Sequence, residues 1–253
     1  MLWFGDSLLN LPRGSWLFLF AHPDDDVLIA GTVFTLVERG DRVDLAWLTD
    51  SSSLGGLVRR QAESRAAAHA MAVEQSRVHF RQLPSLAMVP RLVQDFPVVQ
   101  ALIEEVNADF CMVVGFEAGH TDHDCVNFLA ARAAGGRPLY EYPLYNSAAG
   151  GFQINRFPQG SCEFQPLSQE AVERKHLTMQ LYSSQWPYMV CARMATPVSL
   201  MIQRGEPYRL CPPDRDYSQA PHPGTLNVDR IFNRFMRWRF ADFAAAVRQF
   251  DCQ

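Results

Sequence analysis

A continuous apolar segment that ends in a histidine and three acids constrains this chain more strongly than any other feature. Residues 16–21 are apolar without alternation, as in buried parallel strands, and His22, Pro23 and Asp24–Asp26 follow directly. An apolar pattern with helical spacing then runs over residues 26–39. Acids and proline are favoured in the first turn of a helix. Capping therefore explains one or two of these residues, but it does not explain the histidine before them.

Strand and helix patterns alternate along most of the chain. We expect strands at residues 16–21, 42–49, 78–83, 110–115 and 139–145, and helices at 26–39, 57–73, 97–106, 125–134, 170–181 and 230–250. This alternation favours an α/β fold, a Rossmann-like three-layer sandwich with a mostly parallel sheet. We interpret residues 1–253 as a single domain with its core at 14–145. Residues 146–253 form a smaller, irregular C-terminal elaboration that we expect to build a substrate wall, and residues 187–216 give no clear pattern.

Composition excludes several functional classes. The net charge of −4 does not favour nucleic acid as a partner. No apolar run reaches the length of about 18 residues that a membrane-spanning helix needs. The N-terminus lacks the basic segment of a signal peptide, and six scattered cysteines without a CxxC pair fit reduced thiols. We therefore expect a cytoplasmic protein. Its basic, aromatic last helix is expected to pack on the core and not on a membrane.

A second cluster, Gly119–Asp124, follows the expected strand at 110–115 and contains His120 and His123. In a doubly wound sheet the first and fourth strands are neighbours, so both clusters should meet at the carboxyl edge. A Gly-rich turn such as GxGxxG is absent there, which disfavours a dinucleotide cofactor. Two histidines and a carboxylate with room for water are typical of a catalytic zinc site. His22 and Asp25 can supply two ligands from one turn, with Asp24 beside them as general base.

These motifs resemble the PIG-L/LmbE-like family of zinc-dependent N-acetylglucosaminyl de-N-acetylases. The resemblance covers about residues 16–190, and it rests on His22-Pro23-Asp24-Asp25, Leu48-Thr49-Asp50, Arg60-Gln61-Ala62-Glu63, His120-Thr121-Asp122-His123, Lys175 and Tyr182-Ser183-Ser184-Gln185. It implies a hydrolase that removes acetyl from a small-molecule N-acetyl amino-sugar conjugate. It also implies roles for individual residues: Zn²⁺ on His22, Asp25 and His123, Asp24 as general base, His120 as oxyanion stabiliser, Arg60 as a substrate contact and Glu63 as a brace.

The chain departs from the family pattern at three places, and these leave the substrate class open. Asp26 stands where the family usually has Glu, Thr121 where it has Pro, and Gly31-Thr32 where it has a glycine pair. Two alternatives remain: a non-catalytic protein that binds sugar or metal, and a metal amidase that acts on a larger acyl conjugate. The same ligands accept Fe²⁺ or Co²⁺. The carrier of the sugar and the oligomeric state stay undetermined.

The other histidines receive structural interpretations. His69, His79 and His176 have no acidic neighbours in the sequence, so we expect them in the core or on the surface. We expect His222, in a Pro-rich loop, to face solvent.

Overall fold

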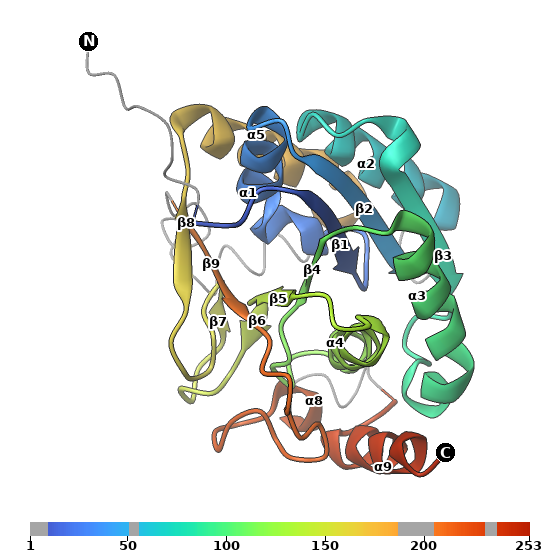
Figure 1. The fold of residues 1–253 in the computed structure, drawn as a ribbon. Coiled ribbons are helices and arrows are strands. Elements are labelled where there is room, and N and C mark those ends of the chain that lie inside the picture. The colour runs from blue at the N-terminus through green and yellow to red at the C-terminus, as the bar shows by residue number, and fades with distance from the viewer. Residues whose placement is uncertain (1–9, 51–55, 187–204, 231–236) are drawn as a thin grey trace.

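A seven-stranded sheet forms the centre of the part of the chain that the computed structural model describes, which is residues 10–50, 56–186, 205–230 and 237–253 (Figure 1). Its order is β3-β2-β1-β4-β5-β9-β8. The strands are β1 (Ser15–Phe20), β2 (Arg42–Thr49), β3 (Val78–Leu83), β4 (Phe110–Val114), β5 (Leu139–Tyr142), β8 (Glu163–Pro166) and β9 (Gly205–Leu210). Strands β1 to β5 pair in parallel, while β9 pairs antiparallel with β5 and β8. The expected mostly parallel sheet, with the first strand beside the fourth, is confirmed.

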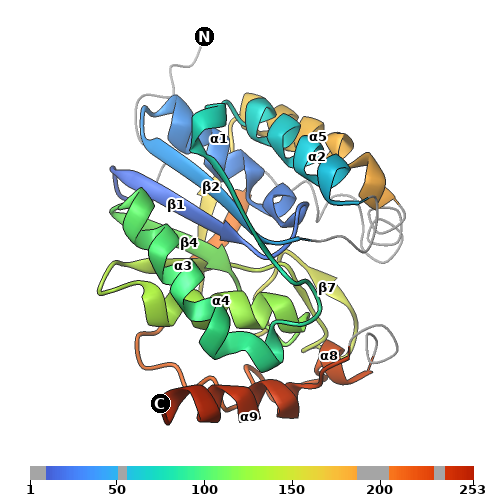
Figure 2. The same cartoon turned by 90° about the vertical axis from the view of Figure 1, so that its right-hand side faces the viewer.

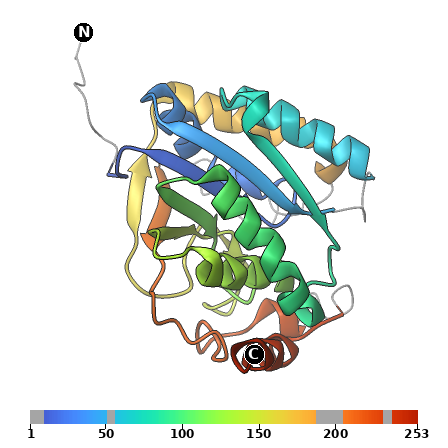
Figure 3. The ribbon, with the colours of Figure 1, turned by 45° about the vertical axis from the view of Figure 1, so that its right-hand side comes forward.

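Helices cover both faces of the sheet. Helices α1 (Ala30–Glu38), α2 (Leu57–Ala70) and α5 (Gln169–Leu181) form one layer, and α3 (Leu92–Val106) and α4 (Thr121–Ala133) form the other (Figure 2). Helix α9 (Phe240–Asp251) packs against α3 and α4 on the outside of the second layer (Figure 3). The expected three-layer sandwich is therefore confirmed. Among the described residues, no helix has the length and apolarity to span a bilayer.

Burial explains the unbroken apolar pattern of β1. Each residue from Trp16 to Phe20 has no exposed surface. The ring of Phe20 lies 5.3 Å from that of Trp47 in β2, and the ring of Trp16 lies 4.8 Å from that of Phe110 in β4. Both faces of a parallel strand are covered by helices, so side chains on both sides must be apolar.

Several expected helix boundaries differ from the structure. The helix expected at residues 26–39 is divided into a 3-10 turn (Asp25–Leu28) and α1. Helix α3 begins at Leu92, five residues before the expected start at Pro97. Helix α4 begins at Thr121 and not at Cys125, because the side chain of His120 accepts a hydrogen bond from Asp122 N and caps the helix.

The C-terminal elaboration is more regular than its sequence indicates. Strands β6 (Tyr145–Asn146) and β7 (Gln153–Ile154) form a hairpin, while β8 and β9 extend the main sheet. The long final helix expected at 230–250 is not continuous: residues 237–239 are not helical, α9 begins only at Phe240, and Arg230 ends the short helix α8 (Asn227–Arg230), while residues 231–236 lie outside the described residues. The described cysteines are all free thiols, whereas Cys191 lies outside the description.

Candidate active site

The pairing of β1 with β4 brings the two polar clusters together. His22 follows β1, and His120 and His123 occupy the N-cap and first turn of α4, after β4. The carboxyl ends of neighbouring parallel strands meet at one edge, so residues a hundred positions apart become neighbours. Nδ1 of His22 lies 3.1 Å from Nε2 of His123. The meeting of both clusters, predicted from the sheet order, is confirmed.

Three donor groups form a close triangle, which we call the metal triangle: His22, Asp25 and His123. Nε2 of His123 lies 3.2 Å from Asp25 Oδ1, and Nδ1 of His22 lies 3.7 Å from Asp25 Oδ2. A tetrahedral cation with bonds of about 2.0–2.1 Å separates its ligand atoms by about 3.3 Å. The observed spacings therefore fit one divalent cation. Burial opposes ionisation of Asp25, but the neighbouring imidazoles hold the pKa of this carboxyl well below its usual range.

His120 extends this triangle into a cluster of three histidines. The ring nitrogens of His22, His120 and His123 that could hold a cation lie within 4.8 Å of one another. Nδ1 of His120 accepts the hydrogen bond from Asp122 N, at 3.0 Å, so in the neutral ring Nε2 carries the proton. Burial lowers the pKa of His120 well below its ordinary value, and the charges of His22 and His123 lower it further. His120 can therefore act as a neutral hydrogen-bond donor. To bind a cation through Nε2, it would have to move its proton to Nδ1 and lose the hydrogen bond from Asp122 N.

Asp122 fixes the orientation of His22, a role that sequence reasoning missed. Its Oδ2 lies 3.0 Å from Nε2 of His22 and accepts a hydrogen bond from Leu86 N at 2.7 Å. Although Asp122 is fully buried, these hydrogen bonds and the charges of His120 and His22 lower its pKa to about 2. The ionised carboxylate holds the proton of His22 on Nε2, which directs Nδ1 into the metal triangle. The sequence contained a signal for this role, since an acid stands between the two histidines of the second motif.

Asp24 lies at the edge of the metal triangle in a strained conformation. Its φ of 103° is rare for residues other than glycine. Burial raises the pKa of Asp24 to about 8, against the guanidinium of Arg60, whose Nη2 is 3.3 Å from Asp24 Oδ1. The Asp24 side chain keeps 20% of its surface exposed, so solvent or substrate can reach it. A divalent cation nearby would favour the ionised form.

Arg60 is oriented toward the acids and not outward from helix α2. Its side chain is only 5% exposed, and its guanidinium also donates a hydrogen bond to the carbonyl of Pro23. These contacts connect helix α2 to the His22–Asp25 turn and stabilise the position of the turn. The predicted substrate contact of Arg60 stays a prediction.

The late sequence motif is explained by buried polar contacts behind the His22–Asp25 turn. Tyr182 donates a hydrogen bond to Asp26 at 2.6 Å, and Nζ of Lys175 lies 2.6 Å from Glu206. Glu63 accepts hydrogen bonds from Ser183 Oγ, at 3.0 Å, and from the backbone and side chain of Ser184. The late segment is thereby fixed to α2 and to the turn that carries the acids.

The expectation that His222 faces solvent was wrong, whereas His79 has a structural role, as expected. His79 lies 3.0 Å from Asp44 Oδ1 across β2 and β3, so it has an acidic partner that is distant in the sequence. His222 is buried, 3% exposed, and its Nε2 lies 3.2 Å from the carbonyl oxygen of Glu117. Neither belongs to the metal triangle.

Comparisons with known proteins find a matching family model and solved structures of the same fold. Residues 17–134 match the family model described as "PIG-L: GlcNAc-PI de-N-acetylase". The deacetylase Dbv21, which acts on the A40926 pseudoaglycone, superimposes with a TM-score of 0.60 at 19% identity, over 78% of this chain and 96% of its own. The zinc-inhibited form of teicoplanin deacetylase Orf2 gives 0.58 at 16% identity, over 78% and 98%.

The same fold also occurs with another chemistry. The 4-carboxy-2-hydroxymuconate hydratase GalB of Pseudomonas putida KT2440 gives a TM-score of 0.53 at 17% identity, over 78% of this chain and 94% of its own. Comparison with curated proteins gave no match. At these identities the structural likeness establishes the fold, and function has to be argued from the site.

Proposed function

We propose that this chain, whose residues 17–134 match the PIG-L family model, is a metal-dependent de-N-acetylase. It hydrolyses the acetamide of an N-acetylated amino-sugar conjugate and releases acetate and a free amine. The observation that carries this proposal is the metal triangle with Asp24 at its edge. A cation site with an adjacent carboxylate is a combination that can support amide hydrolysis by water.

His22, Asp25 and His123 would hold the cation. Two imidazoles and one carboxylate suit Zn²⁺, and they accept Fe²⁺ or Co²⁺ as well. When bound, the cation would polarise the acyl carbonyl and lower the pKa of water. Asp122 would keep His22 in the tautomer that binds metal, through the 3.0 Å contact with Nε2.

Asp24 and His120 divide the remaining chemistry. The Asp24 carboxylate takes a proton from the attacking water and returns it to the nitrogen as the C–N bond breaks. Its exposed edge leaves room for both transfers. Nε2–H of His120 donates to the carbonyl oxygen as negative charge develops there, since Nδ1 is engaged with Asp122 N. Arg60 keeps Asp24 in place and could reach substrate beside it.

The partner is a small molecule, and the sugar carrier is open. The proposal includes a cytoplasmic location, in keeping with the free thiols of the described cysteines. Nothing in the charge of the chain favours nucleic acid.

A deacetylation screen tests the proposal. Zinc-loaded protein should release acetate from at least one N-acetylglucosamine conjugate. Asp24→Asn should lower kcat by about 10²–10⁴-fold, the usual contribution of a general base, and keep its metal. His123→Ala should reduce the bound zinc, while Asp214→Asn, at an exposed acid, serves as the control. Release of only a bulkier acid would favour the larger-acyl amidase. Zinc binding without any turnover would favour the binding protein.

A further inference from the structure

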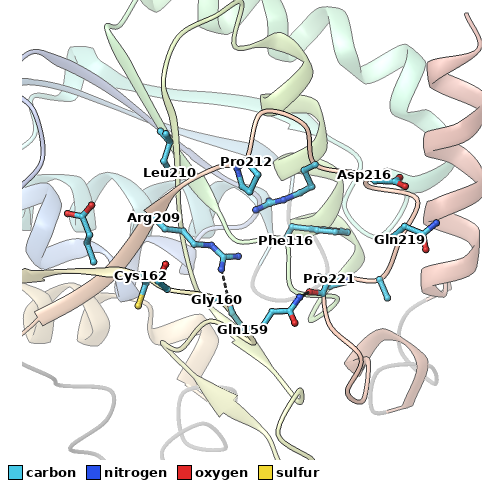
Figure 4. A pocket seen from close by; sticks show the side chains of 14 residues that line it. Phe116, Gln159, Gly160, Cys162, Arg209, Leu210, Pro212, Asp216, Gln219 and Pro221 are labelled. Carbon is cyan, nitrogen blue, oxygen red and sulfur yellow. Dashed lines mark hydrogen bonds between the residues drawn. The ribbon is translucent and has the colours of Figure 1, made fainter.

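A cavity of about 860 Å³ opens on the β9 side of the sheet (Figure 4). It is lined by residues 159–163, 209–210, 212, 215–216 and 219–221 and by Phe116. No residue of the metal triangle lines it. Its volume lies within the range of about 300–1,000 Å³ that is common for small-molecule sites. The cavity is therefore large enough for a small-molecule ligand, and such a ligand would bind away from the metal triangle.

Two arginines at the cavity share one buried acid. Glu141, in β5, has no exposed surface. Nε of Arg209 lies 2.7 Å from Glu141 Oε1, and Nη2 of Arg215 lies 2.6 Å from the same oxygen, while Nη1 of Arg215 lies 2.7 Å from Oε2. Two guanidinium charges thus face one carboxylate, which leaves one positive charge without a counterion in this group.

The acids on the cavity wall do not supply that counterion. Glu163 accepts a hydrogen bond from Tyr208, and Asp216 accepts two from Ser218. Neither lies within 4 Å of Arg209 or Arg215 in the described part of the chain. Figure 4 shows Asp216 directed away from the guanidinium of Arg209.

Both guanidinium groups are held in fixed positions and keep free donors. Arg209 stacks over Phe157, with 4.0 Å from its Cζ to the ring centroid, and donates from Nη1 to Gln159 O (Figure 4). Arg215 lies over Phe116. Within the part of the chain that the structure describes, neither Nη2 of Arg209 nor Nε of Arg215 has a hydrogen-bond partner. Fixed guanidinium donors are well suited to bind planar or tetrahedral oxyanions.

We propose that this cavity binds a small molecule through an oxyanion group, a carboxylate or a phosphate, held by Arg209 and Arg215. The oxyanion takes the place of the missing second counterion, and the rest of the ligand occupies the open volume above Pro212 and Pro221. This site is separate from the metal triangle and does not depend on the proposed deacetylation.

Isothermal titration of the full chain tests the proposal with two probes, inorganic phosphate and succinate, which distinguish the two kinds of oxyanion. Chloride at the same ionic strength is the reference. One probe should bind saturably, and more weakly as salt increases. Arg209→Gln should weaken binding about tenfold or more, as expected for loss of a charge-assisted hydrogen bond. Arg174→Gln, at a half-exposed arginine on α5, should leave binding unchanged.

A second variant keeps the Glu141 pairs intact. Ala220→Trp places a large side chain at the exposed wall of the cavity and should block binding, whereas Ala245→Trp, on the exposed face of α9, should not. Three results would overturn the proposal: neither probe binds, binding survives both cavity variants, or binding disappears in His123→Ala but persists in Arg209→Gln. The last result would assign the anion to the metal triangle.

Discussion

Lys175→Met should destabilise the fold strongly, although Lys175 touches no residue of the metal triangle. Nζ of Lys175 donates to Glu206 Oε1 at 2.6 Å and to the carbonyl of Leu28 at 3.0 Å, and both charged side chains are almost fully buried. Glu206 also accepts the backbone N–H groups of Gly31 and Thr32. This group of contacts ties α5 and β9 to the start of α1, just after the turn that carries the acids.

The magnitude follows from what the substitution leaves behind. Methionine preserves most of the volume, but Glu206 remains as a buried carboxylate without its cation. Removing one partner of a buried ion pair typically costs about 3–5 kcal/mol. For a chain of this size, that loss corresponds to a decrease in Tm of about 6–20 °C. The two backbone donors to Glu206 favour the lower half of this range.

Urea unfolding with metal removed by EDTA measures the effect without metal linkage. The double variant Lys175→Met/Glu206→Gln should recover about 2 kcal/mol relative to Lys175→Met, because the neutral amide removes the buried charge. Arg174→Met, whose salt bridge lies at the surface, should cost about 1 kcal/mol or less. A loss below about 1 kcal/mol in Lys175→Met, or no recovery in the double variant, would refute the reasoning.

Three further predictions concern residues in and around the site. Asp122→Asn should weaken zinc binding about 10–100-fold, measured by competition with a chelator, since it removes the carboxylate that fixes a ligand imidazole. Burial raises the pKa of Glu117 from 4.5 to about 7, because ionisation of this carboxyl is disfavoured in the folded state. The stability that the protonated Glu117 side chain contributes is therefore lost as pH rises from about 4.5 through 7. In urea unfolding of the metal-free protein, the free energy of unfolding of Glu117→Gln relative to that of the parent chain should therefore be higher at pH 8 than at pH 5. An equal difference at both pH values would contradict this assignment. Gly119→Ala should reduce both stability and turnover, because a Cβ there collides with the carbonyl of Tyr145, whereas Gly151→Ala meets open space and should behave like the parent chain.

Local patterns were sufficient to predict the part of the site that lies within the first motif. A buried strand must be apolar on both faces, and it must deliver the next residues to its carboxyl end, so His22 and the aspartates were placed correctly from periodicity alone. The parallel order of β1 and β4 followed from the alternation of strands and helices. The meeting of His22 with His123 is a consequence of these two facts.

Contacts between distant segments could not be predicted in the same way. The sequence alone does not reveal three side-chain pairs between distant segments. They are Arg60 with Asp24, Asp44 with His79, and Glu141 with Arg209. A buried charge requires a partner, but the partner is chosen by which strands and helices happen to pack together, and periodicity carries no information about that choice. The residue types and the edge where they gather were thus determined by the sequence, whereas the tertiary structure decided which polar groups neutralise one another, because that depends on distances across the chain.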